Sequence, residues 1–121
     1  MERKKYINKK VKELSKHIDK LDETKQNVAK DIIDNLAFQM CALSELRELI
    51  VEGGFTEMYQ NGANQYGTKQ SSNVATYNKL MVTYNQTTKL FVSLFAKEDG
   101  TELKKDLEFG QFIGKARAVK R

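Results

Sequence analysis

Proline and tryptophan are absent from this 121-residue sequence, which also contains only one cysteine and one histidine. Because no proline interrupts the chain, its long periodic segments favour helices. A single cysteine excludes an intrachain disulfide, so the protein does not need an oxidising compartment. The length corresponds to one domain, which is too small for a nucleotide-binding sheet with a second lobe.

Long hydrophobic runs are also missing. No window approaches the roughly 18 to 20 continuous apolar residues that a membrane helix needs. The segment Met1–Lys5 leads into alternating charge and not into an apolar run, so no secretory signal is expected. These observations predict a cytoplasmic protein without a membrane partner.

The residues that usually carry catalysis or bind metals are scarce and scattered. His17 lies on a lysine-rich stretch with no ligand cluster near it, so we interpret it as a surface residue. Cys41 lies in the most apolar part of the chain and is interpreted as a small buried hydrophobe. Two acidic pairs lack a third type of ligand and are interpreted as solvated helix faces. These pairs are Asp31 with Asp34 and Glu45 with Glu48. The sequence therefore predicts no enzyme, no cofactor and no metal site.

Apolar residues that recur every three or four positions predict a first helix over 3–21. They are Ile7, Val11, Leu14, Ile18 and Leu21. Residues 1–20 also hold eight Lys or Arg against three acids, so the rest of this helix is basic. The capping-type side chains of 22–24 are expected to end it. Residues 1–24 are thus predicted to form a basic, helical N-terminal arm.

The strongest helical pattern covers residues 25–52. Between Leu36 and Leu43 the only polar residue is Gln39, so the helix is apolar nearly all round. Such a helix must be covered on several sides, which a chain with two or three helices cannot easily do alone. Gly53 and Gly54 are expected to end it as a C-terminal cap.

Residues 53–71 are rich in amides, glycine and tyrosine and are expected to reverse the chain. The spacing of Phe55, Met58 and Tyr59 predicts one or two extra helical turns before the loop itself. Tyr59 and Tyr66 are expected to pack over the turn.

A third helix is predicted to start at a serine cap, Ser71 or Ser72, and to run to about Lys97. It has roughly the same length as the second helix, and the two are joined by a reversing loop, so an antiparallel hairpin is expected. The predicted fold is therefore all-α, with a helical-hairpin core over 25–97 and a weakly ordered basic tail over 98–121.

The apolar surplus of the hairpin predicts that several copies associate. The predicted interface between copies consists of Ile32, Leu36, Phe38, Met40, Leu43, Tyr77, Met81, Tyr84 and Phe91.

Positive charge is concentrated at the two ends of the chain, whereas residues 26–52 carry two bases against five acids. A cationic arm can follow a phosphate backbone, so these ends are candidates for DNA binding. The candidates are Arg3, Lys4, Lys5, Lys9, Lys10, Lys12, Lys16, Lys115, Arg117, Lys120 and Arg121. A solvated helix face with a frayed tail remains the alternative interpretation.

The sequence around the reversing loop contains a distinctive set of motifs. They are Asn35-Leu-Ala-Phe38, Glu48-Leu-Ile-Val-Glu-Gly-Gly54, Glu57-Met-Tyr-Gln-Asn-Gly-Ala-Asn-Gln-Tyr-Gly67, Tyr77-Asn-Lys-Leu-Met81 and Thr87-Thr-Lys-Leu-Phe91. Together they span roughly 25–97 and resemble the small subunit of a tailed-bacteriophage terminase, of the short helical-hairpin type. The family usually has proline where this chain has Asn73, and its third helix usually ends Leu-Leu-Pro where this one has Leu94-Phe-Ala. Both departures affect helix ends and not the hairpin faces.

The resemblance implies a homo-oligomeric ring in the host cell cytoplasm. Such a ring recognises double-stranded viral DNA and presents it to the terminase large subunit, which carries the ATPase and the nuclease. Two alternatives remain open from the sequence. One is a dimeric helical DNA-binding regulator that has no motor partner. The other is an adaptor that does not bind DNA and recruits another helix through the apolar residues from Ile7 to Leu21.

Overall fold

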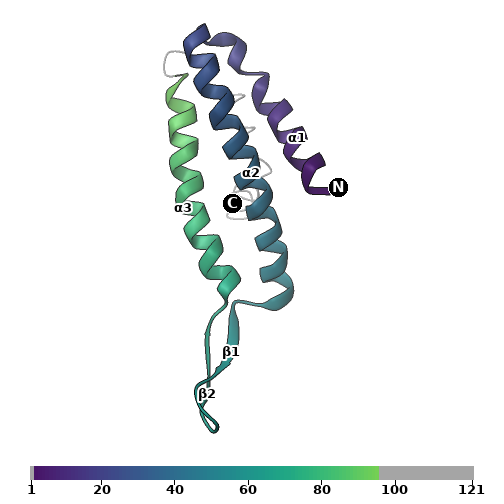
Figure 1. Ribbon diagram of the computed structural model, residues 1–121, viewed down its shortest axis with the longest axis vertical. Helices are drawn as coiled ribbons and strands as arrows, with labels where there is room; N and C mark the ends of the chain where they lie inside the picture. The colour runs from purple at the N-terminus through teal and green to yellow at the C-terminus, as the bar shows by residue number, and fades with distance from the viewer. Residues whose placement is uncertain (1, 96–121) are drawn as a thin grey trace, which may run out of the picture.

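The computed structural model describes residues 2–95, and Figure 1 shows their arrangement. In chain order the elements are α1 (Glu2–Ser15), the short 3-10 helix η1 (Ile18–Lys20), α2 (Glu23–Gly53), β1 (Thr56–Gln60), β2 (Tyr66–Gln70) and α3 (Ser72–Ser93). The predicted basic tail over 98–121 lies outside the described residues.

Helices α2 and α3 lie side by side and antiparallel, and α1 folds back along the first half of α2 (Figure 1). The predicted antiparallel helical hairpin is therefore confirmed. The two strands form a narrow ribbon that projects beyond the helices at the end of the molecule opposite η1 (Figure 1). The basic N-terminal helix and the strand ribbon thus belong to different parts of the molecule.

Local capping chemistry sets the ends of the two long helices. The Asp22 side chain accepts the backbone N–H of Lys25 at 2.9 Å and so caps the start of α2, whereas the sequence predicted only that residues 22–24 end the preceding helix. Gly54 ends α2 with φ of 89°, a conformation that favours glycine, and its N–H donates to the carbonyl of Ile50. Ser71 caps α3 in the same way as Asp22 caps α2.

The two helices at the ends of the described chain are shorter than predicted. The first ends at Ser15, because the backbone N–H of His17 bonds to the carbonyl of Leu14 and tightens the chain into a turn before η1. The third ends at Ser93 and continues as a turn to Phe95. Both shifts fall where periodicity defines a helix least well.

The core lies along α2, which is covered by α1 and η1 on one side and by α3 on another. Leu36 and Ala37 have no exposed surface in the single chain, and Leu43 has 1%. The expectation that one chain cannot cover this apolar helix is therefore wrong for these three residues, whereas Phe38 in the same segment is 64% exposed. The arm that was predicted to bind DNA supplies the missing cover, since Leu14, Ile18 and Leu21 belong to the same core cluster.

Residues 53–71 correct the all-α prediction. Instead of extra helical turns, β1 and β2 pair antiparallel, with Met58 opposite Thr68 and Gln60 opposite Tyr66. The helix cannot continue because Gly54 turns the backbone away, and Gly62, with φ of 94°, lies in the turn between the strands. The apolar spacing suggested a helix, but a strand pair forms.

Candidate DNA-binding and self-association surfaces

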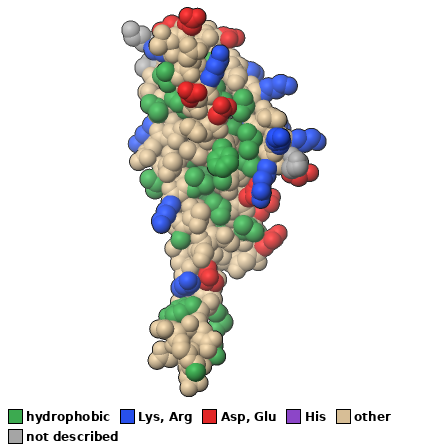
Figure 2. All heavy atoms as spheres, viewed as in Figure 1, with side chains coloured by type: hydrophobic (Ala, Val, Ile, Leu, Met, Phe, Trp, Pro, Cys, Tyr) green, Lys and Arg blue, Asp and Glu red, His purple; other side chains and the backbone are tan. Residues whose placement is uncertain are grey.

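Four of the predicted DNA-binding lysines form a single exposed row. Lys5, Lys9 and Lys12 lie on α1 and Lys16 directly follows it, at spacings of four, three and four residues. All four are exposed, whereas Leu14 on the same helix is buried against the core. The row is about 16 Å long at the helical rise. We call Lys5, Lys9, Lys12 and Lys16 the lysine row; cationic side chains gather over α1 in Figure 2.

Lys4 is exposed close to the row, but two other candidates have partners within the protein. The Arg3 guanidinium donates to the Glu45 carboxylate at 2.6 Å and so ties the start of α1 to α2. This bond lowers the pKa of Glu45 and raises that of Arg3. Lys10 pairs with Glu13 at 3.4 Å and lies 5.5 Å from the centre of the Tyr6 ring. Arg3 therefore links α1 to α2, whereas Glu13 and Tyr6, which Lys10 contacts, lie on α1 itself.

The four C-terminal candidates lie outside the described residues. They are Lys115, Arg117, Lys120 and Arg121.

The histidine and the cysteine are both buried. His17 is only 6% exposed, so its interpretation as a surface residue is wrong; it lies in the turn where the chain passes from α1 to η1. Cys41 is buried as predicted, and its thiol donates to Glu45 at 3.6 Å. Burial raises the pKa of this thiol. Its environment is that of a packed residue and not of a reactive nucleophile.

The residues predicted to join copies fall into three groups. Ile32, Leu36, Met40, Leu43, Tyr84 and Phe91 are buried within one chain. Tyr77 and Met81 are half-buried against the same core. Phe38 is the exception, since 64% of its surface is exposed on α2. The predicted set therefore combines the core of the single chain with one strongly exposed aromatic residue.

Five further large apolar residues of the two long helices are also exposed. They are Val28, Leu49 and Val51 on α2, and Val82 and Leu90 on α3. Figure 2 shows apolar side chains gathered over the helical body, with cationic side chains beside them. The apolar pattern of the sequence did not distinguish these exposed positions from buried ones, since Val28 follows the same four-residue spacing as the buried Ile32 and Leu36.

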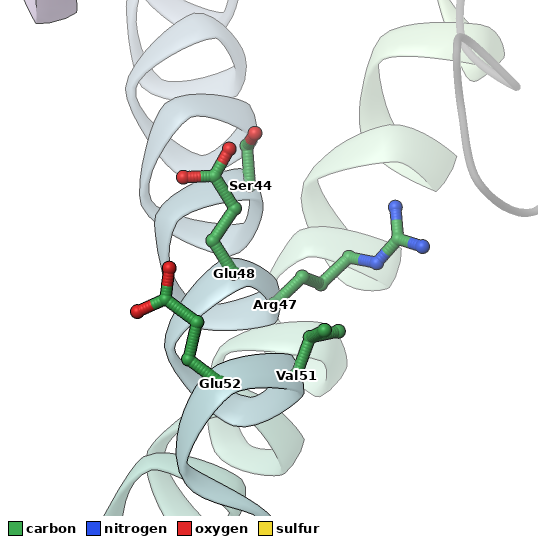
Figure 3. A pocket seen from close by; sticks show the side chains of 5 residues that line it. All are labelled: Ser44, Arg47, Glu48, Val51 and Glu52. Atoms are coloured by element: carbon green, nitrogen blue, oxygen red, sulfur yellow. The ribbon is translucent and has the colours of Figure 1, made fainter.

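The helical body has two hollows that are candidates for ligand sites. A groove of about 200 Å³ lies between α1 and α2, and its lining includes Ile7, Phe38 and Ala42. A wider hollow on α2 is shown in Figure 3, where Glu48 and Glu52 extend to one side and Arg47 to the other. The groove also contains the Cys41 thiol, which donates to Glu45, but burial raises the pKa of this thiol and so disfavours the reactive thiolate. The hollow on α2 is lined by Ser44, Val51 and three charged side chains. Within residues 2–95 no three metal-ligating side chains cluster, and no helix there is long and apolar enough to cross a membrane.

The strand ribbon has two chemically different faces. Alternation along the strands puts Glu57, Tyr59, Gly67 and Lys69 on one face. There the Tyr59 ring lies over Gly67, where an added Cβ would come within 2.9 Å of it. Tyr66 projects from the other face and is 65% exposed, so only Tyr59 packs over the ribbon as expected.

Comparison of the chain with protein-family models, with curated proteins and with solved structures gives no match. What the protein does must therefore be argued from its own residues and surfaces.

Proposed function

We propose that this chain is the small subunit of a bacteriophage terminase, which binds viral DNA as a homo-oligomeric ring and presents it to the large subunit. The observation that carries the DNA-binding part is the lysine row, exposed along one face of α1. The resemblance over residues 25–97 supplies the packaging role and the large-subunit partner.

The lysine row is suited to a phosphate backbone and not to a small acidic ligand. Its four charges are spread over about 16 Å, so they can contact several successive phosphates but cannot converge on one group. The N-terminal part of the chain positions the row rigidly, because Arg3 is bonded to Glu45 and Leu14 is buried. A row on an ordered helix loses less backbone entropy on binding than a disordered arm does.

Charge elsewhere orients the approach of DNA. The exposed acids Asp31, Asp34, Glu48 and Glu52 all lie on α2. They repel phosphates from that helix, so DNA is expected to approach over α1. A single copy offers four row charges and binds weakly, but a ring presents many rows and gains avidity.

The exposed apolar residues support the oligomeric part of the proposal. Phe38 on α2 and Val82 and Leu90 on α3 are each more than half exposed. Exposed apolar residues mark a contact with another protein when they form one contiguous patch, which the proposal assumes of these positions. In the proposed ring these residues contact a neighbouring copy.

The lysine row can be tested by replacing all four lysines with glutamine. The variant is expected to bind double-stranded DNA more weakly, with a flatter dependence of affinity on salt. Four lost phosphate contacts reduce the slope of log K against log salt by about 3.6 for each engaged subunit. A matched control replaces Lys25, Lys30, Lys79 and Lys89, which are also exposed, and leaves the row intact. Equal loss in both variants would show that only net charge matters, which contradicts a defined site.

The mass of the particle in solution tests the oligomeric part. Light scattering on a sizing column at moderate salt is expected to give one discrete particle of many subunits. A dimer that binds DNA would favour the regulator instead. A particle that does not retain DNA at any salt concentration would favour the adaptor.

A further inference from the structure

Among residues 2–95, strands β1 and β2 pair only with each other, so each strand has one paired edge and one outer edge. Asn61 donates its N–H to the carbonyl of Gln65, and Ser71 donates to that of Phe55, so these are hydrogen-bonded pairs. In an antiparallel ribbon such pairs alternate with pairs whose N–H and C=O groups point outward. The outward residues are therefore Thr56, Met58 and Gln60 on β1, and Tyr66, Thr68 and Gln70 on β2.

These six residues are exposed, and we call them the uncharged edge set. None of them is charged and none is proline, so the usual devices that protect a strand edge are missing. The only charged residues of the two strands, Glu57 and Lys69, occupy inward-paired positions on the opposite face. In Figure 2 the ribbon shows apolar and uncharged surface beyond one acidic and one basic group near its base.

An isolated two-stranded ribbon is at best marginally stable in water. Here the ribbon also projects away from the helices, which cover neither of its faces (Figure 1). Phe55, Met58 and Tyr66 are each at least 65% exposed on or next to it. Each strand therefore has an open edge beside apolar side chains, as expected of a strand that pairs with another strand.

We propose that the ribbons of neighbouring copies pair edge to edge, with the outer edge of β1 in one copy bonded to the outer edge of β2 in the next. This proposal depends on the self-association in the proposed function and names the contact. The arrangement is head-to-tail, so it forms a ring when the rotation between copies closes and an open filament when it does not; the proposed ring requires the first. β1 and β2 are antiparallel within a copy. When neighbouring copies have the same orientation, β1 of one copy is therefore also antiparallel to β2 of the next.

Charge complementarity favours a second copy as the occupant. Glu57 lies opposite Lys69 within one ribbon, and the pKa of Glu57 is lowered mainly by its hydrogen bond from Ser72 and to a smaller extent by the charge of Lys69. When copies pair at the same level, each Glu57 also lies beside the Lys69 of a neighbour. Acidic and basic groups then alternate around the ring, which avoids like charges on adjacent strands.

The same charges argue against DNA as the occupant. One Glu57 and one Lys69 leave the two strands with no net charge, so they offer no attraction to phosphates. The lysine row lies on α1, away from the ribbon end of the molecule (Figure 1). The two surfaces can therefore be used at the same time by different partners.

Cysteine pairing tests which edges meet. Met58→Cys and Thr68→Cys are each made in full-length chains that also carry Cys41→Ser, and the two variants are co-expressed with different tags. Mild oxidation with copper–phenanthroline is expected to give disulfide-linked dimers that contain both tags. Neither variant alone should give disulfide-linked dimers. In the proposed order of strands, one strand lies between equivalent strands of neighbouring copies, so equivalent cysteines are two strand spacings apart, about 10 Å, which is too far for a disulfide. Met58→Cys with Asn85→Cys, an exposed position on α3, is the matched control.

The outcomes separate this inference from the proposed function. Dimers formed by Met58→Cys alone would show that like edges meet and would overturn the head-to-tail arrangement. A particle of many subunits without mixed disulfides would overturn ribbon pairing but leave self-association standing. A monomer in light scattering would overturn both together.

Discussion

The two ends of the molecule offer different atoms to a partner. At the α1 end the contacts available are side-chain ammonium groups, held on a helix whose other face is buried in the core. At the ribbon end they are backbone N–H and C=O groups at two open strand edges. Ammonium groups favour any polyanion, whereas an open edge accepts only an extended strand. The first end is therefore suited to DNA of any sequence and the second to a geometrically defined protein contact.

The ends also differ in how firmly the fold holds them. Helix α1 contributes to the common core through Leu14, while no residue of either strand is buried. Opening of the ribbon exposes little that is not already exposed, so it costs little free energy in a single copy. Pairing with a neighbour would therefore change the ribbon far more than the helices.

The largest expected effect is a loss of stability from a substitution in the helical core, compared with one beside the ribbon. Phe91 has no exposed surface and packs edge-on to Phe95, with ring centroids 5.3 Å apart. Phe91→Ala should lower the free energy of unfolding by about 3–5 kcal/mol, because it leaves a cavity between α3 and α2. Urea unfolding measures the change. Phe55→Ala, at a 72% exposed position, is the control and should change stability by less than about 0.5 kcal/mol. Similar losses in both variants would contradict the division into core and ribbon.

Two proline substitutions in β2 should distinguish the effect of losing a donor on the open outer edge from the effect of unpairing β1 and β2. The N–H of Thr68 points outward, so Thr68→Pro removes a donor from the open edge but none from the pairing of β1 with β2. For Thr68→Pro we expect smaller particles in light scattering and an unchanged helix content by circular dichroism. The lysine row lies outside the ribbon and should not be affected. Lys69→Pro, at the next residue, removes an inner bond and should unpair the strands. An unchanged particle size for Thr68→Pro would contradict edge-to-edge pairing.

Some of these features can be predicted from the sequence because they are local. Asp22 and Ser71 cap their helices through bonds that span only two or three residues, and Gly54 ends α2 through its own backbone conformation. The exposed lysines of α1 follow from helical periodicity in the same way. Local chemistry thus predicts both the helical hairpin and the lysine row.

The features that the sequence did not reveal depend on distant contacts. The apolar spacing of Phe55, Met58 and Tyr59 fits a helix equally well, and only pairing with β2 places Met58 and Tyr59 on opposite faces. His17 is buried in the turn between α1 and η1, which the spacing within one helix does not reveal. Arg3 finds its partner 42 residues along the chain. Periodicity within one segment contains no information on any of these contacts.

A smaller effect is expected at the junction between the ribbon and α3. The Glu57 carboxylate accepts the backbone N–H of Ser72 at 2.6 Å, and this bond lowers the pKa of Glu57. A carboxyl group with a lowered folded-state pKa stabilises above its unfolded pKa, and the contribution is lost as pH falls through the folded value. Wild-type melting temperature should therefore fall on acidification below about pH 4.5 more steeply than that of Glu57→Gln. Glu48→Gln, at an exposed position on α2, is the control and should follow the wild type.

The smallest expected effect concerns the one polar residue in the apolar run of α2. The Gln39 amide donates to the Thr87 hydroxyl at 3.2 Å, but its carbonyl oxygen is buried without a partner. In Gln39→Leu that unsatisfied oxygen disappears, and Thr87 keeps its bond to the carbonyl of Thr83 at 2.9 Å. The substitution should therefore leave stability unchanged or raise it by up to about 1 kcal/mol in urea unfolding. Thr87→Val, which deprives the Gln39 amide of its acceptor, should instead destabilise by about 1 kcal/mol or more. A loss of similar size in both variants would mean that the Gln39–Thr87 bond outweighs the unsatisfied oxygen, and that this polar contact contributes to the packing of α2 against α3.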